Sequence, residues 1–434
     1  MTQVCFEVTI VGAGMFGSAA AKYLSAEQTN IALIGPEEPI DKLAASSQRV
    51  FGAHYDQARI TRRLGWDEVW AATDSKSLNR YRDIEKASGI PFFYECGSLI
   101  LMAKSISSRT EVMLDQCKAN DIPIERMTTE SMEHHWPYLK IPQILGGVEG
   151  LYEDQMAGYL NPRKLVKAQL SLFQRNGGNL IRGTVTHVKK NKPSNLWQLD
   201  VTLNGKIQTV YTKKILIAAG AFINHNEILP PGYKLELHSF TEPNLLFEVG
   251  LEEVESLKKM PTIITVDPED TGNKNMSIYL LPPVKYPDDK YYIRIGPGMQ
   301  PIVEHLDSLE QMRKWYIQQQ ITTQQRDFLL QMQQILLPNI KPKSIKEACC
   351  VIEKTPIHYP YIGQINEDSS LNVVVGGNGH GARGSDEIGR LAAGIVMGHE
   401  WDFPIEQSRF KPILITDNQL NKIKLACKPP FGLC

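Results

Sequence analysis

The stretch "FEVTIVGAGMFGSAAAKYL", residues 6–24, decides the fold. An apolar strand leads into Gly12, Gly14 and Gly17, which have the spacing G-x-G-x-x-G, and an alanine-rich helix follows. In such a pattern the first glycine permits a tight turn, the second lets a pyrophosphate approach the backbone, and the third lets helix and strand pack closely. The free N–H groups of the helix N-terminus then face the phosphates. We therefore predict a dinucleotide-binding unit at this point of the chain.

The next strand, "NIALIG" at residues 30–35, departs from the usual pattern. Such a strand normally ends in an acidic residue that holds the ribose hydroxyls. Here it ends in Gly35, and Glu37 and Glu38 follow. We assign the ribose contact to Glu37, and the alternative is that both glutamates are solvated loop charges. No arginine stands at the strand end, so nothing indicates a 2′-phosphate.

Residues 180–222 predict a three-stranded meander with a hairpin turn at Asn204-Gly205. The segment ends in "ILIAAGAF", an apolar strand followed by small residues. This continuation is typical of FAD-binding two-dinucleotide folds, whereas an NAD-binding unit usually continues as plain strand–helix repeats. We expect Val185 and Gly220 of this segment to contact the cofactor.

A second glycine loop lies in "VVVGGNGHGARGSDEIG", residues 373–389, between an apolar strand and a helix. Gly379 and Gly381 let backbone N–H groups approach the cofactor. Ser385 is the expected helix cap, and the helix N-terminus favours negative charge such as that on the edge of a reduced flavin. Two further side chains project from this loop, His380 and Arg383. The alternatives to a role at the cofactor are a structural hydrogen bond for the histidine and a surface position for the arginine.

The order of these segments predicts a mixed α/β fold with a discontinuous FAD-binding, Rossmann-like domain and a second domain built on an antiparallel sheet. The cofactor domain is expected to comprise residues 1–90, 150–225 and 345–400, and the substrate domain residues 91–149 and 226–344. Residues 401–434 form a C-terminal tail.

Composition excludes several classes of protein. The 434 residues carry a formal net charge of -1, which favours neither nucleic acid nor an anionic membrane. The seven cysteines are irregularly spaced, which argues against a disulfide framework or a zinc site and for a reducing compartment. A strand begins almost at the first residue and leaves no room for a signal peptide. We therefore expect a cytoplasmic protein, a monomer or small homo-oligomer, without a metal.

Five motifs occur in a recognisable order: "VGAGMFG", "QARITRR", "AAGAF", "CCVIEKTP" and "GHGAR". In this respect the chain resembles the D-amino acid oxidase superfamily, and within it the branch of monomeric sarcosine oxidase, N-methyltryptophan oxidase, pipecolate oxidase and fructosyl amino acid oxidases. The resemblance implies FAD as cofactor. It also implies oxidation of the C–N bond of an amino acid, with a secondary, N-methyl or cyclic amine expected, to an imine, with dioxygen reduced to hydrogen peroxide.

The same resemblance implies roles for particular residues. Counted back from Thr355, Cys350 matches the cysteine that forms a thioether to the flavin in the branch. Arg59 matches a flavin contact, and Arg62 and Arg383 match the two basic residues that hold the substrate carboxylate. Two guanidinium groups can each donate a bidentate fork to one carboxylate. The alternative for Arg62 is a structural ion pair.

Two departures from the branch leave alternatives open. Arg294 stands where the branch has its oxygen-activating lysine, and we expect Tyr279 to face the flavin ring. The element "TPIHYPYIG" is common in superfamily members with noncovalent FAD, so the bond to Cys350 and noncovalent binding both remain open. A dehydrogenase with another electron acceptor and a non-catalytic flavoprotein that serves as an interaction or assembly factor are the alternative functions.

Overall fold

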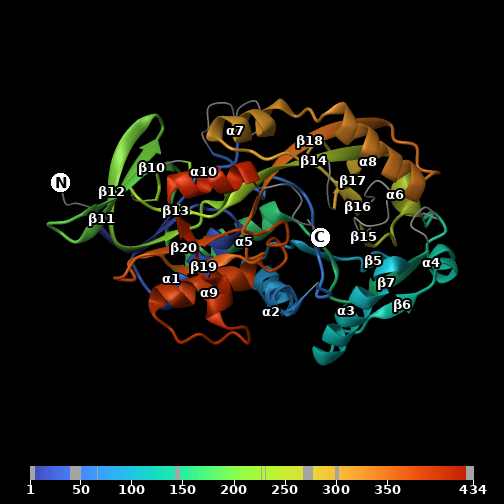
Figure 1. Ribbon diagram of the computed structural model, residues 1–434, viewed down its shortest axis with the longest axis horizontal. Coiled ribbons are helices and arrows are strands. Elements are labelled where there is room, and N and C mark those ends of the chain that lie inside the picture. Colours follow the sequence, from blue (N-terminus) through green and yellow to red (C-terminus); the bar gives the residue numbers. More distant parts are fainter. Residues whose placement is uncertain are drawn as a thin grey trace.

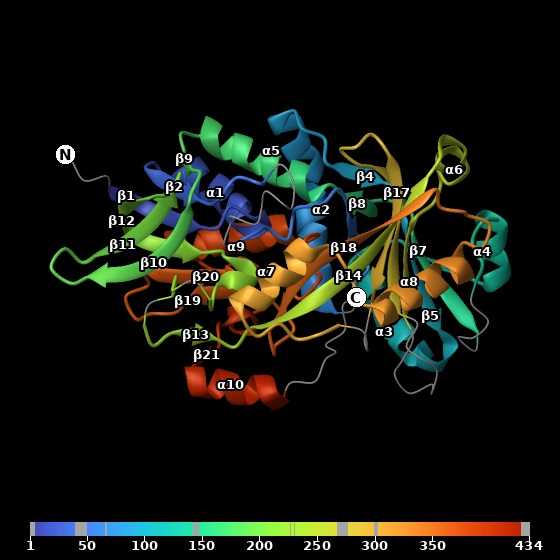
Figure 2. The ribbon, with the colours of Figure 1, turned by 90° about the horizontal axis from the view of Figure 1, so that it is seen from above.

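The computed structural model describes residues 5–39, 50–65, 67–141, 147–225, 227–229, 231–266, 277–298 and 303–426. The molecule is elongated, with one large sheet and its helices towards one end and a second large sheet towards the other (Figure 1). One edge of the second sheet is a long antiparallel ribbon of β14 (His238–Val249) and β18 (Ser344–Lys354), which lies in the middle of the molecule (Figure 2).

The first sheet has the strand order β10-β11-β12-β1-β2-β9, and β20 joins it by pairing with β12 and with β19. Its strands are β1 (Cys5–Val11), β2 (Ile31–Ile34), β9 (Asn179–Ile181), β10 (Thr184–Asn191), β11 (Leu196–Leu203), β12 (Lys206–Ile217), β19 (Tyr361–Gln364) and β20 (Leu371–Val375). The strands β1, β2, β9, β12 and β20 pair in parallel. They are rich in valine, isoleucine and leucine because both faces of the sheet are buried.

Helices cover one face of this sheet. They are α1 (Met15–Glu27), α2 (Glu68–Ser88), α5 (Pro162–Arg175) and α9 (Ser385–Met397). Small residues let α1 and α9 approach closely, since a Cβ added at Gly389 would lie 2.4 Å from the Cβ of Ala19. Asn161 caps α5, because its side chain accepts a hydrogen bond from the Lys164 N–H.

The second sheet has the order β18-β14-β17-β16-β15-β5-β7-β6 and is antiparallel except where β15 meets β5. Its other strands are β5 (Ser98–Ala103), β6 (Glu125–Met127), β7 (Val148–Glu153), β15 (Thr262–Val266), β16 (Ile278–Lys285) and β17 (Tyr291–Pro297). The helices associated with it are α3 (Ser107–Ala119), α4 (Thr129–His135), α6 (Leu251–Ser256), α7 (Leu309–Gln318) and α8 (Thr323–Leu336). One apolar core joins this sheet to α4 and α8.

Short elements complete the fold. The strands β3 (Arg59–Thr61), β8 (Gly158–Leu160) and β4 (Phe93–Glu95) form a small sheet, and β13 (Lys234–Leu235) pairs with β21 (Leu414–Ile415). The remaining elements are η2 (Lys104–Ile106), η4 (Gly220–Phe222), η6 (Gln407–Phe410) and α10 (Asp417–Ala426). Within the residues that the structure describes, no helix combines the length and apolar character needed to cross a bilayer.

The predicted fold class is confirmed, and so is the meander of β10, β11 and β12. Its turn has Asn204 at φ 49° and Gly205 at φ 75°, which is the backbone that an Asn-Gly hairpin adopts. The predicted cap of α9 is wrong by one residue, because Gly384 is the cap and Ser385 is already helical. The boundaries of the two domains stay a prediction.

Candidate active site

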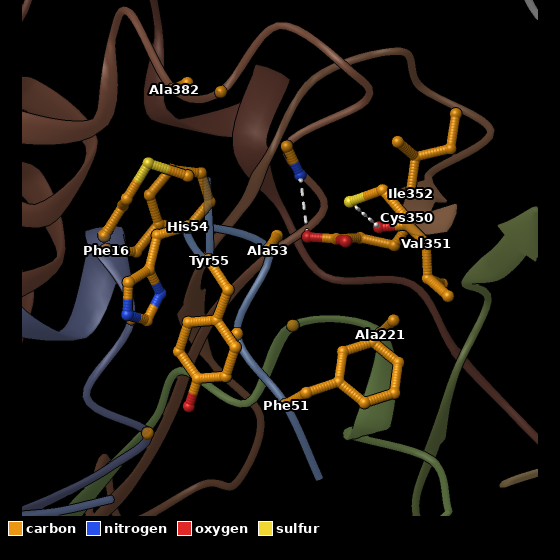
Figure 3. A pocket seen from close by; sticks show the side chains of 18 of the residues that line it. Phe16, Phe51, Ala53, His54, Tyr55, Ala221, Cys350, Val351, Ile352 and Ala382 are labelled. Carbon is orange, nitrogen blue, oxygen red and sulfur yellow. Dashed lines mark hydrogen bonds between the residues drawn. The ribbon is translucent and has the colours of Figure 1, made fainter. Parts of the chain in front are cut away.

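A long cavity begins at the carboxyl ends of the parallel strands and continues to the β14–β18 ribbon. Its lining includes residues 11–16, 34–36, 50–55, 183–185, 218–222, 350–353 and 379–383. Figure 3 places Cys350 on one side of the cavity and His54 and Tyr55 on the other. Ligands of open α/β sheets bind at this edge, where the strand order reverses.

The three glycines of the first loop differ in what surrounds them. Gly12 has φ 110°, and a Cβ there would lie 2.3 Å from the Ala218 carbonyl oxygen. A Cβ on Gly17 would lie 1.9 Å from the Gly12 carbonyl oxygen. At Gly14 the nearest atom is His54 Nδ1 at 3.9 Å. Gly12 and Gly17 therefore close the turn, while Gly14 leaves the N-terminus of α1 open towards the cavity.

This geometry fits the pyrophosphate of a dinucleotide. Gly14 is the cap of α1, and no side chain makes a capping hydrogen bond there. The backbone N–H groups of the first turn are thus available to an anion. Gly35 and Pro36 line the cavity, whereas Glu37 and Glu38 are not among its lining residues. Glu38 instead accepts a hydrogen bond of 2.5 Å from Arg163, and the ribose contact of Glu37 stays a prediction.

The second glycine loop packs against the first turn of α1. Gly379 has φ 83°, and a Cβ on Gly381 would lie 2.7 Å from the Phe16 ring. His380 is packed against the indole of Trp70, with ring centroids 5.1 Å apart. Burial, together with the neighbouring charge of Arg383, holds the pKa of His380 well below its ordinary value. His380 is therefore a neutral imidazole in the cavity wall.

Arg62 and Arg383 meet at a buried carboxylate. Both line the cavity, and their exposed fractions are 2% and 3%. Arg383 Nε forms an ion pair with Asp74 of α2, which is fully buried. Burial raises the pKa of Asp74 to about 7, although the charges of Arg383 and Arg62 oppose that rise. The structure thus brings the two predicted arginines together around an aspartate that sequence reasoning missed.

Arg294 lies in a second polar cluster. It forms an ion pair with Asp56 and donates hydrogen bonds to Asn244 Oδ1 at 2.9 Å and to Tyr279 Oη at 3.3 Å. Burial would raise the pKa of Asp56, but the charges of Arg294 and Arg59 outweigh it and hold that pKa below its ordinary value. The positive charge of Arg294 is therefore compensated by an ionised aspartate.

Glu242 of β14 also lines the cavity and was not predicted. Its carboxyl oxygen Oε1 lies at a hydrogen-bonding distance of 2.7 Å from Tyr279 Oη, and its exposed fraction is 6%. In the register of the ribbon Glu242 lies opposite Cys350, so the two side chains share one face. The signal that could have identified Glu242 was an acidic residue in the middle of β14, a strand whose residues are almost all buried.

The two adjacent cysteines point to opposite sides of β18, as expected for a strand. Cys350 lines the cavity, and Arg59 Nη2 lies 4.0 Å from its sulfur. Cys349 is 2% exposed and packs in the apolar cluster of η4 and α7. Val185 and Gly220 also line the cavity, and their contact with the cofactor stays a prediction. Gly17 lies behind the cavity wall. The predicted cofactor and substrate residues are thus gathered at one cavity, with the exception of Glu37 and Gly17.

Comparison with known proteins agrees with this arrangement. The profile of a protein family described as FAD-dependent oxidoreductase (DAO) matches residues 7–395. An N-methyl-L-tryptophan oxidase of Yersinia pestis (strain Pestoides F) is 23% identical over 228 residues, which are 52% of this chain and 56% of the relative. The match thus spans little more than half of that relative's length.

Solved structures share the fold at low identity. The open form of NikD, described as an unusual amino acid oxidase essential for nikkomycin biosynthesis, superposes with a TM-score of 0.74 at 17% identity. That superposition covers 95% of this chain and 98% of NikD. The L-proline dehydrogenase of P. horikoshii superposes with a TM-score of 0.68 at 16% identity, over 93% of this chain and 96% of the dehydrogenase.

Proposed function

Because the chain belongs to the DAO family of FAD-dependent oxidoreductases, we propose that it oxidises the C–N bond of an amino acid to an imine. The observation that carries the proposal is the pair of buried arginines, Arg62 and Arg383, at a cavity that Gly12 and Gly14 also line. A secondary amine, either N-methyl or cyclic, is the proposed substrate. The similarity to an N-methyl-L-tryptophan oxidase supports this choice.

The residues that would hold FAD are those of the two glycine loops. Gly12, Gly14 and the N-terminus of α1 would bind the pyrophosphate, and Glu37 would reach the ribose. Cys350 would form the thioether, and noncovalent binding is the alternative. When bound, the flavin supplies the hydride-accepting chemistry.

The protein's part in the reaction is to hold and orient the substrate. Arg62 and Arg383 would donate to both carboxylate oxygens and so fix the position of the reacting C–H bond. The neutral imidazole of His380 adds no further positive charge beside them. Ile264 and Leu281 line the cavity with apolar surface and would exclude water from the reacting carbon. A noncyclic imine would then be hydrolysed by water, whereas a cyclic product would persist.

The electron acceptor is proposed to be dioxygen, which would be reduced to hydrogen peroxide. One observation favours the alternative, a dehydrogenase that uses another acceptor: Asp56 compensates the charge of Arg294. A compensated cation stabilises developing negative charge on oxygen less than a free one does. A non-catalytic flavoprotein is the remaining alternative, and the buried arginine pair speaks against it because a flavin scaffold alone needs no carboxylate site. We further propose a cytoplasmic protein that is a monomer or a small homo-oligomer.

Anaerobic flavin bleaching tests the proposal. We expect one or more N-methyl, cyclic or D-amino acids to bleach the flavin of the wild-type protein. In the variant Arg62→Lys the substrate concentration for half-maximal bleaching should rise by roughly 10- to 100-fold, since a lysine cannot donate a bidentate fork. Arg63→Lys is the matched control, because the neighbouring Arg63 donates to Glu153 at 2.7 Å and does not line the cavity. Absence of bleaching by every amine would refute the catalytic proposal.

A further inference from the structure

The Tyr279 hydroxyl faces two hydrogen-bond acceptors but has only one proton to donate. Its Oη lies 2.7 Å from Glu242 Oε1 and 2.5 Å from Asn244 Oδ1. A phenol carries one proton and can donate it to only one of these oxygens. Arg294 Nη2, at 3.3 Å, is also a donor and cannot receive that proton. The other short oxygen–oxygen contact therefore needs a hydrogen from elsewhere.

The orientation of the Asn244 amide is fixed by its neighbours. Its Nδ2 donates to the backbone carbonyl of Glu242 at 3.0 Å, and its Oδ1 accepts from Arg294 Nε at 2.9 Å. A carbonyl oxygen can only accept and a guanidinium can only donate, so the amide cannot be flipped. The atom that faces Tyr279 is thus an acceptor, and Tyr279 must donate to it.

The second hydrogen can then come only from Glu242. If Glu242 were ionised and Tyr279 donated to Asn244, lone pairs of Glu242 and Tyr279 would face each other at 2.7 Å. If Tyr279 donated to Glu242 instead, lone pairs of Tyr279 and Asn244 would face each other at 2.5 Å. A protonated Glu242 removes both conflicts, because it donates to Tyr279 while Tyr279 donates to Asn244. Each of the two short oxygen–oxygen contacts then contains one hydrogen.

We infer that Glu242 is a neutral carboxylic acid in the resting protein, and that it supplies the proton consumed when the electron acceptor is reduced. The inference rests on the proposed function, because it takes dioxygen as the acceptor. Reduction of dioxygen to hydrogen peroxide takes two electrons and two protons. A reduced flavin can give both electrons and one hydrogen as a hydride equivalent, so the protein must provide the second proton. Glu242 would give that proton and regain one from solvent.

The surroundings of Glu242 suit this role. It lines the cavity, and its Oε2 is buried and makes no hydrogen bond to any residue that the structure describes. The groups that face it are Tyr279 from β16, Arg294 from β17, Arg59 from β3, and Lys354 and Cys350 from β18. Burial raises the pKa of Glu242 to about 7, although the charges of Arg294, Arg59 and Lys354 oppose the rise. The carboxyl that carries the proton, on the Oε1 atom facing Tyr279, thus lies in the wall of the cavity where the acceptor would be reduced.

Infrared difference spectroscopy of the holoenzyme tests the protonation state directly. At about pH 6, below the pKa of about 7, the wild-type protein should show the C=O stretching band of a protonated carboxylic acid, shifted in D₂O. Glu242→Gln should lose the part of that band that comes from Glu242, and any remainder that comes from Asp74, whose pKa is also about 7, should disappear in Asp74→Asn. The wild-type band should fade as the pH rises through the pKa of Glu242. Glu353→Gln is the control, because Glu353 is a second cavity-lining carboxyl whose pKa burial also raises. A band that survives Glu242→Gln but not Glu353→Gln would overturn the inference.

Reoxidation of the photoreduced protein tests the proton transfer. Glu242→Gln keeps a hydrogen-bond donor for Tyr279 but has no acidic proton. It should slow reoxidation by dioxygen at about pH 6 by roughly 100-fold and abolish the decline in rate that the wild type shows at higher pH. An unchanged rate and pH profile would refute the inference. Neither experiment uses an amino acid, so a failure of the proposed substrate class would be seen separately.

Discussion

At the scale of single residues, the two adjacent cysteines show what the alternation of side chains along a strand can predict. Alternation along β18 requires one of them to face the cavity and the other to face the core. Counting from Thr355 selected Cys350, and Cys350 is the one that lines the cavity.

The thioether leads to a prediction about mass. Wild-type protein denatured in acid should retain FAD as added mass, and Cys350→Ser should release all of it. Cys349→Ser, whose sulfur lies in the apolar cluster instead, should behave as the wild type does in this measurement. If denatured wild-type protein has the mass of the bare chain, FAD is bound noncovalently.

Asp74 and Glu242 could not be identified as site residues from the sequence. Each is a single acidic residue within a helix or strand, and such a residue is equally consistent with an internal ion pair or a solvated edge. What makes them notable is contact with Arg383 and Tyr279, which are more than 30 positions away in the chain. Local patterns report which face a residue occupies, but they do not report what lies across from it.

At the scale of elements, the strand–loop–helix units were predictable because their requirements are local. The turn before α1 needs a glycine at φ 110°, and the hairpin needs Asn-Gly. The eight-residue strands of the meander follow from alternation and turn residues. The order of strands in each sheet was not predictable in this way, because it depends on pairing between distant segments such as β5 and β15.

The glycine turn predicts two different kinds of damage. Gly12→Ala should destabilise the fold itself, because its Cβ would overlap the Ala218 carbonyl. Gly14→Ala should leave the apoprotein folded, because the nearest atom to the added methyl group is His54 Nδ1 at 3.9 Å. It should weaken FAD binding, because that methyl group would stand where the pyrophosphate approaches the backbone. Thermal unfolding of both apoproteins and fluorescence titration with FAD would separate the two effects. Equal losses of stability would contradict the assignment.

The first turn of α9 leads to a prediction about stability. Fully buried Asp386 accepts from Lys22 at 2.5 Å, from Tyr23 at 2.8 Å and from Arg80 at 2.8 Å, which ties α9 to α1 and α2. Removing one partner leaves a buried charge undercompensated, so Lys22→Met should cost about 3–5 kcal/mol in the free energy of urea unfolding. Lys258→Met, which breaks an exposed pair with Glu255, is the control and should have little effect. Equal urea midpoints for the two variants would contradict the role of this cluster.

At the scale of the whole molecule, buried carboxyls set the pH dependence of stability. Burial raises the pKa of Glu242 to about 7, so the folded state holds a proton that the unfolded chain releases near its ordinary value. The stabilisation of the folded state that comes from this proton is complete when the pH is below the ordinary pKa of a glutamate. It is lost as the pH rises to about 7.

Between about pH 5 and pH 7 the free energy of unfolding of the wild type should therefore fall relative to that of Glu242→Gln, by up to about 1.4 kcal/mol per pH unit. Urea unfolding across this range is the measurement, and Glu255→Gln on the exposed surface is the matched control. Parallel curves for the wild type and Glu242→Gln would show that this carboxyl is ionised throughout the range.

The sheet order has a consequence for the life of the chain on the ribosome. The cofactor cavity is lined by the turn at Gly12, the start of the meander at Val185 and the loop at Gly379–Gly381. That last loop reaches the other two only when β20 pairs with β12. Translation proceeds at about 5–20 residues per second, so the first loop waits many seconds for its partners. Nascent chains stalled before β20 should fail to retain FAD. Capture of the cofactor is then one of the last events of biosynthesis, although its binding motif is among the first segments to emerge.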